Sequence, residues 1–110
     1  MEGLVKGDVV VIPFPFSDLS ASKKRPAVII ANLTGDDYII AQITSVARTD
    51  NYSISLETKD FKSGKLPHNS MVRPNKLFTA DKSLISYKAG SIDGKKIKEI
   101  EKSLVNIFTK

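Results

Sequence analysis

The hydrophobic positions of the chain fall into short runs divided by polar turns, a pattern that predicts a small sheet of several strands. Residues 9–12 are β-branched throughout and predict a first strand, which we expect to end at Pro-Phe-Pro, 13–15, because proline cannot donate to a strand ladder. Residues 27–31 are apolar at every position, which predicts a central strand. The polar segment 32–37 predicts a hairpin turn into a third strand at 38–44.

The second half of the sheet has a less regular pattern. Residues 52–57 alternate between apolar and polar, which is typical of a half-exposed strand. Residues 58–69 are polar and predict a loop or a short turn, and 70–80 predict one or two strands bent around Pro74. A short apolar stretch at 84–87 follows, before the segment that ends the chain.

The end of the chain has the spacing of an amphipathic helix. Asp93 is a good N-cap residue, and lysines and glutamates separate the apolar positions Ile97, Ile100, Leu104, Ile107 and Phe108. About five short strands followed by one helix predict a mainly β fold, a small curled sheet or barrel with the C-terminal helix laid on it. Its length of 110 residues fits one domain spanning residues 1–110.

Composition adds a weak functional hint and several exclusions. A net charge of +5 favours an anionic partner such as nucleic acid, although mildly basic proteins are common. The absence of cysteine excludes disulfide and thiolate chemistry, and a single histidine without clustered carboxylates predicts no metal or other cofactor. Neither a signal peptide nor a run of membrane-spanning length is present, so we expect a cytoplasmic protein with no membrane partner.

Three segments, taken in order, resemble the PemK/MazF (Kid-like) toxins of type II toxin–antitoxin systems. The first pairs Lys-Gly-Asp-Val-Val at 6–10 with Lys-Lys-Arg-Pro and an apolar strand at 23–30. The second is Ala-Gln-Ile-Thr-Ser at 41–45. The third begins with Ser-Met-Val-Arg-Pro-Asn-Lys at 70–76 and runs on to Thr-Ala-Asp-Lys at 79–82. No single motif is specific, but the ordered set spans nearly the whole chain.

This resemblance implies an SH3-like, CcdB-like barrel of about five to seven strands with a C-terminal helix. It also implies a homodimer that binds single-stranded RNA in a groove built by both subunits. Members of the family typically cleave RNA without a metal through the 2′-hydroxyl, leave a 2′,3′-cyclic phosphate, and are held inactive by a cognate antitoxin protein.

The resemblance also implies the residues of a site. Arg25 would hold the scissile phosphate with its planar guanidinium, or else be a surface arginine paired with a carboxylate such as Asp8. Thr44 and Ser45 would hydrogen-bond phosphate or the 2′-hydroxyl, or else serve the turn. Arg73 would stabilise developing charge, or else be an exposed strand arginine.

Asn75 departs from the family pattern, because some relatives carry an aspartate there as the presumed general base. A neutral amide can orient groups but cannot accept a proton at physiological pH. Asp18 or Asp81 would then be the base, or Arg25 and Thr44 would suffice, or the activity would be weak. Asp81 could instead cap a short helix. His68 lies in a polar segment, and we expect it to be solvated rather than catalytic.

Basic and aromatic side chains would complete an RNA-binding surface. The basic candidates that could follow the phosphate backbone are Lys23, Lys24, Lys76 and Lys82, with Asn75 and Asp81 as further contacts. Phe14 and Phe16 could stack bases or pack in the core, and Phe78 replaces an arginine of several relatives. Two other functions stay open: a protein-binding toxin like the gyrase-poisoning CcdB toxins, and a non-catalytic RNA-binding module.

Overall fold

The computed structural model describes residues 3–15, 22–47 and 49–110. Its strands, in chain order, are β1 (Asp8–Pro15), β2 (Ser22–Asn32), β3 (Asp37–Thr44), β4 (Ile54–Leu56), β5 (Phe61–Gly64), β6 (Ser70–Asp81) and β7 (Tyr87–Ile92). Two short 3₁₀ helices, η1 (Thr58–Asp60) and η2 (Lys82–Leu84), and one α-helix, α1 (Gly94–Phe108), complete the described elements. The expected mainly β fold with a C-terminal helix is confirmed.

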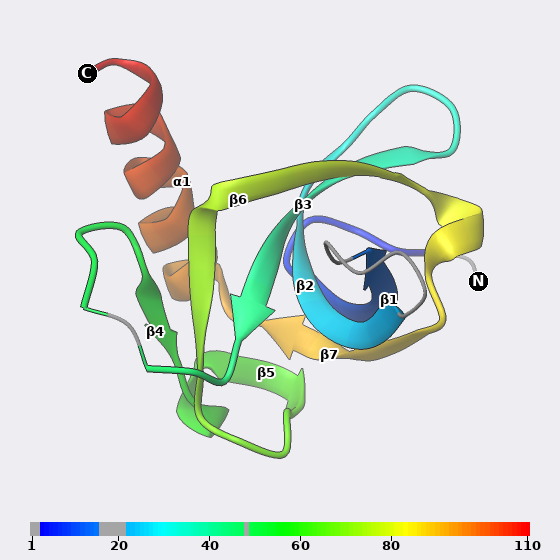
Figure 1. Cartoon of the computed structure of the whole chain (residues 1–110), viewed down its shortest axis with the longest axis horizontal. Coiled ribbons are helices and arrows are strands. Elements are labelled where there is room, and N and C mark those ends of the chain that lie inside the picture. Colours follow the sequence, from blue (N-terminus) through cyan, green and yellow to red (C-terminus); the bar gives the residue numbers. More distant parts are fainter. Residues whose placement is uncertain (1–2, 16–21, 48) are drawn as a thin grey trace.

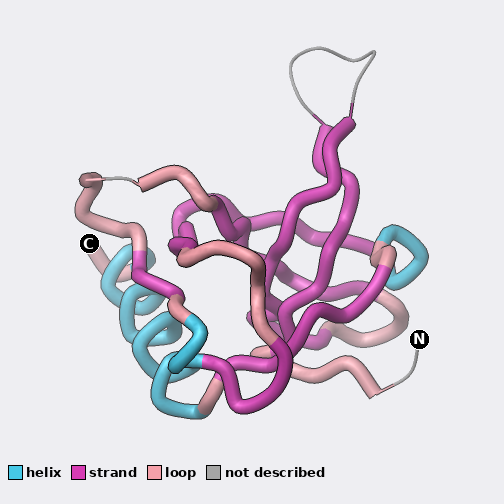
Figure 2. The backbone as a smooth tube through the Cα atoms, turned by 90° about the horizontal axis from the view of Figure 1, so that it is seen from below, coloured by secondary structure: helices cyan, strands magenta, loops and turns pink. Residues whose placement is uncertain are grey.

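The seven strands form one antiparallel sheet in the order β4-β6-β3-β2-β1-β7-β5. The sheet curls on itself, and α1 stands beside β4 and the first part of β6 (Figure 1). β1 and β2 extend away from the rest of the sheet as a long hairpin (Figure 2). The curl brings both ends of the strand order near the helix, so one helix is enough to close one side of the barrel.

Alternating side chains divide the interior into two clusters. The first cluster, on the helix side, includes Ile43, Val72, Ile100 and Leu104. The second cluster occupies the other face of the central strands and is built around Leu4, Val10, Ile12, Ala27, Ile29, Ile40, Ala80 and Ile85. Because β1, β2 and β3 contribute to both clusters, they read as continuous apolar runs, as the sequence at 27–31 indicated.

The sequence predicted that the first strand ends in the segment 13–15, and β1 runs through this segment to Pro15. β7 pairs with β1 only as far as Val11, so beyond that residue β1 has one unpaired edge. A proline at an edge removes no ladder hydrogen bond, and β1 therefore continues through both prolines while pairing with β2.

Two strands were missed in the sequence, β5 within the expected loop at 58–69 and β7 across Gly90. These strands pair with each other at very short range: a Cβ at Gly64 would lie 2.3 Å from the carbonyl oxygen of Ala89, and a Cβ at Gly90 would lie 2.6 Å from that of Ser63. Glycine, usually a strand breaker, is needed here because two backbones touch.

Other local predictions are confirmed. β4 has the expected alternation, with Ser55 exposed between two buried residues. The side chain of Asp93 accepts a hydrogen bond from the backbone N–H of Lys96 and caps α1. Of the helix positions expected to be apolar and inward, Ile100 and Leu104 are buried, but Phe108 is 70% exposed.

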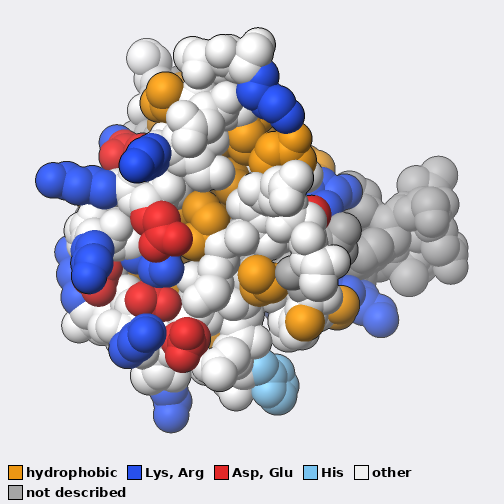
Figure 3. Space-filling view, turned by 90° about the vertical axis from the view of Figure 1, so that its left-hand side faces the viewer, with side chains coloured by type: hydrophobic (Ala, Val, Ile, Leu, Met, Phe, Trp, Pro, Cys, Tyr) orange, Lys and Arg blue, Asp and Glu red, His pale blue; other side chains and the backbone are white. Residues whose placement is uncertain are grey.

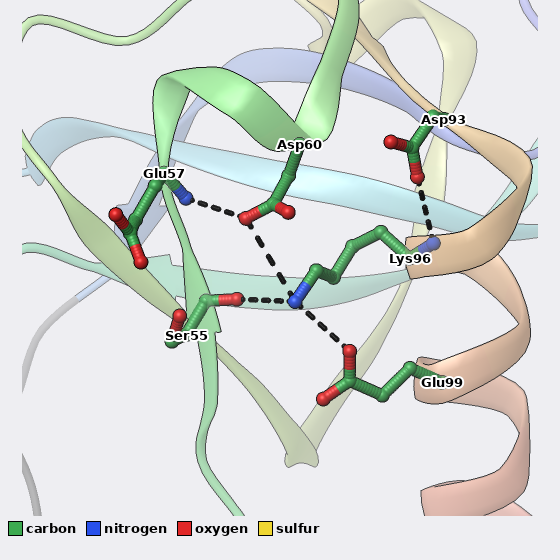
Figure 4. Close-up of polar contacts among 6 residues, drawn as sticks. All are labelled: Ser55, Glu57, Asp60, Asp93, Lys96 and Glu99. Carbon is green, nitrogen blue, oxygen red and sulfur yellow. Dashed lines mark hydrogen bonds and ion pairs between the residues drawn. The ribbon is translucent and has the colours of Figure 1, made fainter.

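A buried lysine joins α1 to β4 and η1 (Figure 4). Lys96 Nζ donates to the carbonyl oxygen of Ser55 at 2.8 Å and to Glu99 Oε1 at 2.9 Å, and lies 3.8 Å from Asp60 Oδ2. The same Asp60 oxygen accepts from the backbone N–H of Glu57 at 2.8 Å. This cluster sets how α1 sits on the sheet.

Candidate functional site

Three strands that are neighbours in the sheet, β2, β3 and β6, carry the main site candidates. In the β2–β3 register Ala27 faces Gln42, and continuing that register by two residues sets Arg25 opposite Thr44. In the β3–β6 register Gln42 faces Arg73. Residues far apart in sequence therefore meet at one end of the central strands.

The same pairing decides which face of the sheet these side chains occupy. Residues directly opposite in an antiparallel pair share a face, as do residues two apart on a strand. Arg25 and Arg73 thus share the face of Ala27 and Gln42, and Thr44 lies on it as well. This is the face of the second cluster, at the point where that apolar core ends.

Thr44 is buried, with 8% of its surface exposed. Its Oγ1 accepts a hydrogen bond from the backbone N–H of Val46 at 3.2 Å, so the threonine does serve the turn after β3. An accepting hydroxyl keeps its own hydrogen, which it can donate to a phosphate or a 2′-oxygen. The hydrogen bond to the turn is therefore compatible with a second hydrogen bond from Thr44 to a substrate.

Both arginines are half-buried at the end of the sheet. The Nε atom of Arg73 is buried and has no hydrogen-bond partner within the described part of the chain. The alternative pairing of Arg25 with Asp8 does not form. The Asp8 carboxylate instead accepts from Ser91 Oγ at 2.6 Å and the Val5 N–H at 2.8 Å, beside Lys88 Nζ at 3.4 Å.

Further polar candidates flank this face. The β3–β6 register jumps from Gln42–Arg73 to Ala41–Leu77, so residues 74–76 form an insertion in β6 next to Arg73. Pro74 is buried there, whereas Asn75 and Lys76 are exposed. Lys23 and Lys24 are exposed on β2 immediately before Arg25. The strands thus place cations on both sides of the Arg25–Thr44 position.

A cleft of about 240 Å³ opens on the opposite face of the same strand ends. Its apolar lining consists of Val11, Pro26, Ile43, Leu66 and Pro67. Its polar lining consists of Lys24, Arg25, Ser45, His68, Ser70 and Tyr87. Arg25 therefore connects this cleft with the Arg25–Thr44 face, and no carboxylate is found among the described lining residues.

His68 and Tyr87 are the residues at this cleft whose place the sequence did not indicate. His68 is exposed, as expected, but the loop after β5 brings it over the strands. Tyr87, at the start of β7, is 53% exposed and faces Val11 in the register. In the sequence, Tyr87 ends the short apolar stretch at 84–87, which does not reveal the strand that pairs with it.

Asp81 lies at the other end of the sheet and is not brought together with Arg25 and Thr44. It faces Asp37, seven residues along β3 from Thr44, which is about 23 Å at roughly 3.3 Å per residue. Its exposed side chain accepts from the Ser83 N–H at 2.8 Å and caps η2. The hydrogen bonds from Ser83 lower the pKa of Asp81.

Lys82 follows Asp81 into η2, where its N–H donates to the carbonyl oxygen of Asp36, so it too lies away from Arg25 within one chain. Within one chain the structure therefore does not bring Asp81 and Lys82 together with Arg25, and their contact with the substrate stays a prediction. Asp18, Phe16 and the side chain of Phe14 lie outside the described residues. Phe78 faces Ile40 and is 37% exposed.

On the face of the molecule that carries α1, the described residues form no continuous basic patch (Figure 3). The face that carries α1 mixes Lys and Arg with Asp and Glu (Figure 3). The described residues hold no group of three or more His, Cys, Asp or Glu side chains that could bind a metal ion. None of the helices in that part of the chain has both the length and the apolarity to cross a lipid bilayer.

The curled antiparallel sheet with one C-terminal helix defines a small SH3-like barrel, and sequence comparison assigns it to a family. The model of the PemK-like, MazF-like toxins of type II toxin–antitoxin systems matches residues 5–108. The chain therefore belongs to this family. No curated protein matches the chain significantly in sequence.

Several solved structures share this fold at low sequence identity. An endoribonuclease from a mycobacterial species, in complex with its cognate antitoxin, has a TM-score of 0.76 at 17% identity, covering 97% of this chain and 96% of that one. The MazE–MazF complex from Deinococcus radiodurans gives 0.77 at 15% identity, covering 96% of each chain. The Mycobacterium tuberculosis toxin MazF-mt6 gives 0.69 at 14% identity, covering 91% and 96%.

Proposed function

We propose that this protein is a toxin endoribonuclease that cleaves single-stranded RNA without a metal ion. The observation that carries the proposal is the meeting of Arg25, Thr44 and Arg73 on one face of three neighbouring strands. Two guanidinium groups and a hydroxyl are the donors that a phosphodiester needs as charge develops on its oxygens. The family and the endoribonucleases among the similar structures support the same activity.

In this mechanism the RNA supplies its own nucleophile. The 2′-hydroxyl oxygen attacks the adjacent phosphorus and loses its proton, and the 5′-oxygen of the next nucleotide leaves and gains one. The products are a 2′,3′-cyclic phosphate and a free 5′-hydroxyl. DNA lacks the 2′-hydroxyl and is not cleaved.

Each residue has a distinct role in this proposal. Arg25 holds two phosphoryl oxygens with its planar fork, and Thr44 donates a hydrogen bond to an oxygen of the same phosphate or orients the 2′-hydroxyl. Arg73 stabilises the added negative charge of the transition state rather than giving a proton, because a guanidinium is not deprotonated in proteins. Ser45 and Asn75 orient the RNA, while Lys23, Lys24 and Lys76 follow its backbone.

We assign no carboxylate as general base. Asn75 is neutral, and Asp81 lies at the opposite end of β3 from Thr44. The proposal is that charge stabilisation by Arg25, Thr44 and Arg73 carries the reaction, with water taking the 2′-proton. This makes the expected rate modest, since positioned general bases typically contribute about 10²–10⁴-fold.

The proposed partners follow from the family. A cognate antitoxin would neutralise the basic RNA-binding surface, as antitoxins accompany the toxins of the mycobacterial and Deinococcus complexes. We propose a homodimer that acts on mRNA in the cytoplasm. An acidic segment in the antitoxin would suit the exposed Lys23 and Lys24 beside Arg25.

The test is incubation of the purified protein with single-stranded RNA in the presence of a metal chelator. Wild-type protein should yield products with 2′,3′-cyclic phosphate ends. Arg25→Ala and Thr44→Val should each lower the cleavage rate about 10²–10³-fold, the usual effect of removing one transition-state donor. Thr44→Ser should restore much of the rate because it restores the hydroxyl.

Lys102→Ala is the matched control, because Lys102 is an exposed cation on α1, away from the site. It should cleave like wild type, and all variants should show cooperative thermal unfolding. Intact RNA that binds tightly would replace the nuclease with an RNA-binding module. Intact RNA without binding, together with growth arrest on expression, would point to a protein target instead.

A further inference from the structure

We infer that the 240 Å³ cleft on the far side of Arg25 is a pocket for one unpaired nucleobase of the RNA, next to the scissile phosphate. The inference rests on the proposed function, because it takes RNA as the ligand of the neighbouring site. It goes further by naming a subsite and the residue, Tyr87, whose ring stacks on the base.

The composition of the cleft suits a nucleobase. Its floor is apolar and comes from the strands, through Val11, Pro26 and Ile43. A base has two apolar faces and a polar edge, and it loses little when its faces leave water. The cleft is smaller than the roughly 300–1,000 Å³ of pockets for drug-sized ligands, so it fits one ring system better than a larger ligand.

The aromatic wall is Tyr87. More than half of the surface of this residue is exposed, 53%, although it faces a buried valine across the sheet. Its hydroxyl makes no hydrogen bond to another residue in the described segments. An exposed ring beside a hydrophobic floor is the usual stacking platform for single-stranded nucleic acid.

The opposite wall is a short loop fixed in place by hydrogen bonding. Ser70 Oγ donates to the carbonyl oxygen of His68 at 2.9 Å, and Leu66 packs against the first cluster. His68 and Ser45 therefore face the cleft as polar groups that can bond the edge of a base, as donor or acceptor. Because this side of the cleft is fixed in position, it favours recognition of one base over another.

Charge at the rim agrees with a nucleotide ligand. Lys24 and Arg25 line the cleft, and none of the lining residues that the structure describes is acidic. Since Arg25 also occupies the face of Thr44, a phosphate held by its guanidinium would leave an adjacent base within reach of the cleft. A pocket for a protein side chain would need no such continuity with a phosphate site.

The test measures binding, so that it does not depend on cleavage. A short single-stranded RNA is selected from a random pool by wild-type protein and made with 2′-O-methyl groups, which prevent 2′-hydroxyl attack. Copies with one abasic position each are then compared by fluorescence anisotropy. One position should stand out by a loss of about 5- to 150-fold, the range for one stacked base.

Tyr87→Ala should lower the affinity for the complete RNA by a similar factor. Its affinity for the RNA that lacks that base should equal the affinity of wild-type protein for the same RNA. Tyr87→Phe, which retains the ring, should restore the difference between the two RNAs, and Lys102→Ala should leave it unchanged. Equal losses on both RNAs in Tyr87→Ala, or no position that couples to Tyr87, would overturn the inference.

Cleavage assays on the parent RNA separate this inference from the proposed function. Cleavage without coupling to Tyr87 would overturn the pocket and leave the nuclease intact. Coupling without cleavage would support the pocket in a protein that only binds RNA. Unchanged RNA affinity of Tyr87→Ala, with loss of antitoxin binding, would assign the cleft to the antitoxin and overturn the inference.

Discussion

Replacing Lys96 by methionine tests how α1 is held on the sheet. The Lys96 side chain is only 11% exposed, and the change keeps most of its aliphatic stem but removes the ammonium group. The main loss is the charge-assisted hydrogen bond to the Ser55 carbonyl at 2.8 Å, worth about 1.5–3 kcal/mol. Glu99 is 54% exposed and its pairing adds under ~1 kcal/mol. Asp60 keeps its bond from the Glu57 N–H.

These contributions predict that Lys96→Met lowers the free energy of unfolding by about 2–3 kcal/mol. For a domain of this size that corresponds to a fall in melting temperature of roughly 10 °C. Urea denaturation followed by circular dichroism gives the free energy, and thermal unfolding gives the second value. Glu99→Gln should cost less than ~1 kcal/mol, because that carboxylate is mostly in water.

Lys98→Met is the matched control, since Lys98 is an exposed lysine of the same helix. It should change stability by no more than ~0.5 kcal/mol. If Lys96→Met and Lys98→Met unfold at the same denaturant concentration, the Lys96 cluster does not hold the helix, and the reasoning from burial and hydrogen bonding is refuted.

Two further changes test other parts of the fold. Gly64 and Gly35 both have positive φ, +69° and +86°, but only at Gly64 would a Cβ collide with backbone, 2.3 Å from the Ala89 oxygen. Gly64→Ala should therefore lower stability more than Gly35→Ala, whose cost is about 1–2 kcal/mol; equal midpoints in urea would contradict this. Because its pKa is lowered, the Asp81 carboxylate stabilises the fold above the ordinary value of 3.8, and this is lost as pH falls through the lower folded value. Asp81→Asn should thus melt lower than wild type at pH 7, with the difference vanishing in strong acid.

Local sequence signals were enough for the elements that depend on local physics. The apolar run at 27–31, the turn before β3 and the alternation in β4 reflect the period of a strand, and Asp93 begins the helix because its side chain satisfies a free N–H. The ordered family motifs also predicted the mainly β class with a terminal helix. The local signals were sufficient because the backbone geometry of these elements depends on residues close in sequence.

Contacts between distant segments could not be read in this way. The sequence did not predict β5 and β7, because Gly64 and Gly90 interrupt the apolar pattern. These two segments are strands only because their backbones pair with each other in the folded protein. Lys96 would be a solvated lysine by sequence, and its burial depends on the Ser55 carbonyl. The sequence predicted both Asn75 and Asp81 as substrate-binding residues, but the strand register places Asp81 at the end of β3 opposite to Thr44.

The sequence by itself therefore determined the family, the fold class and the candidate residues Arg25, Thr44 and Arg73. Only the tertiary structure decided that these residues share one face, and that His68 and Tyr87 border a cleft beside them. The physical reason is that strand register, which sets these positions, arises from pairing between segments far apart in the chain.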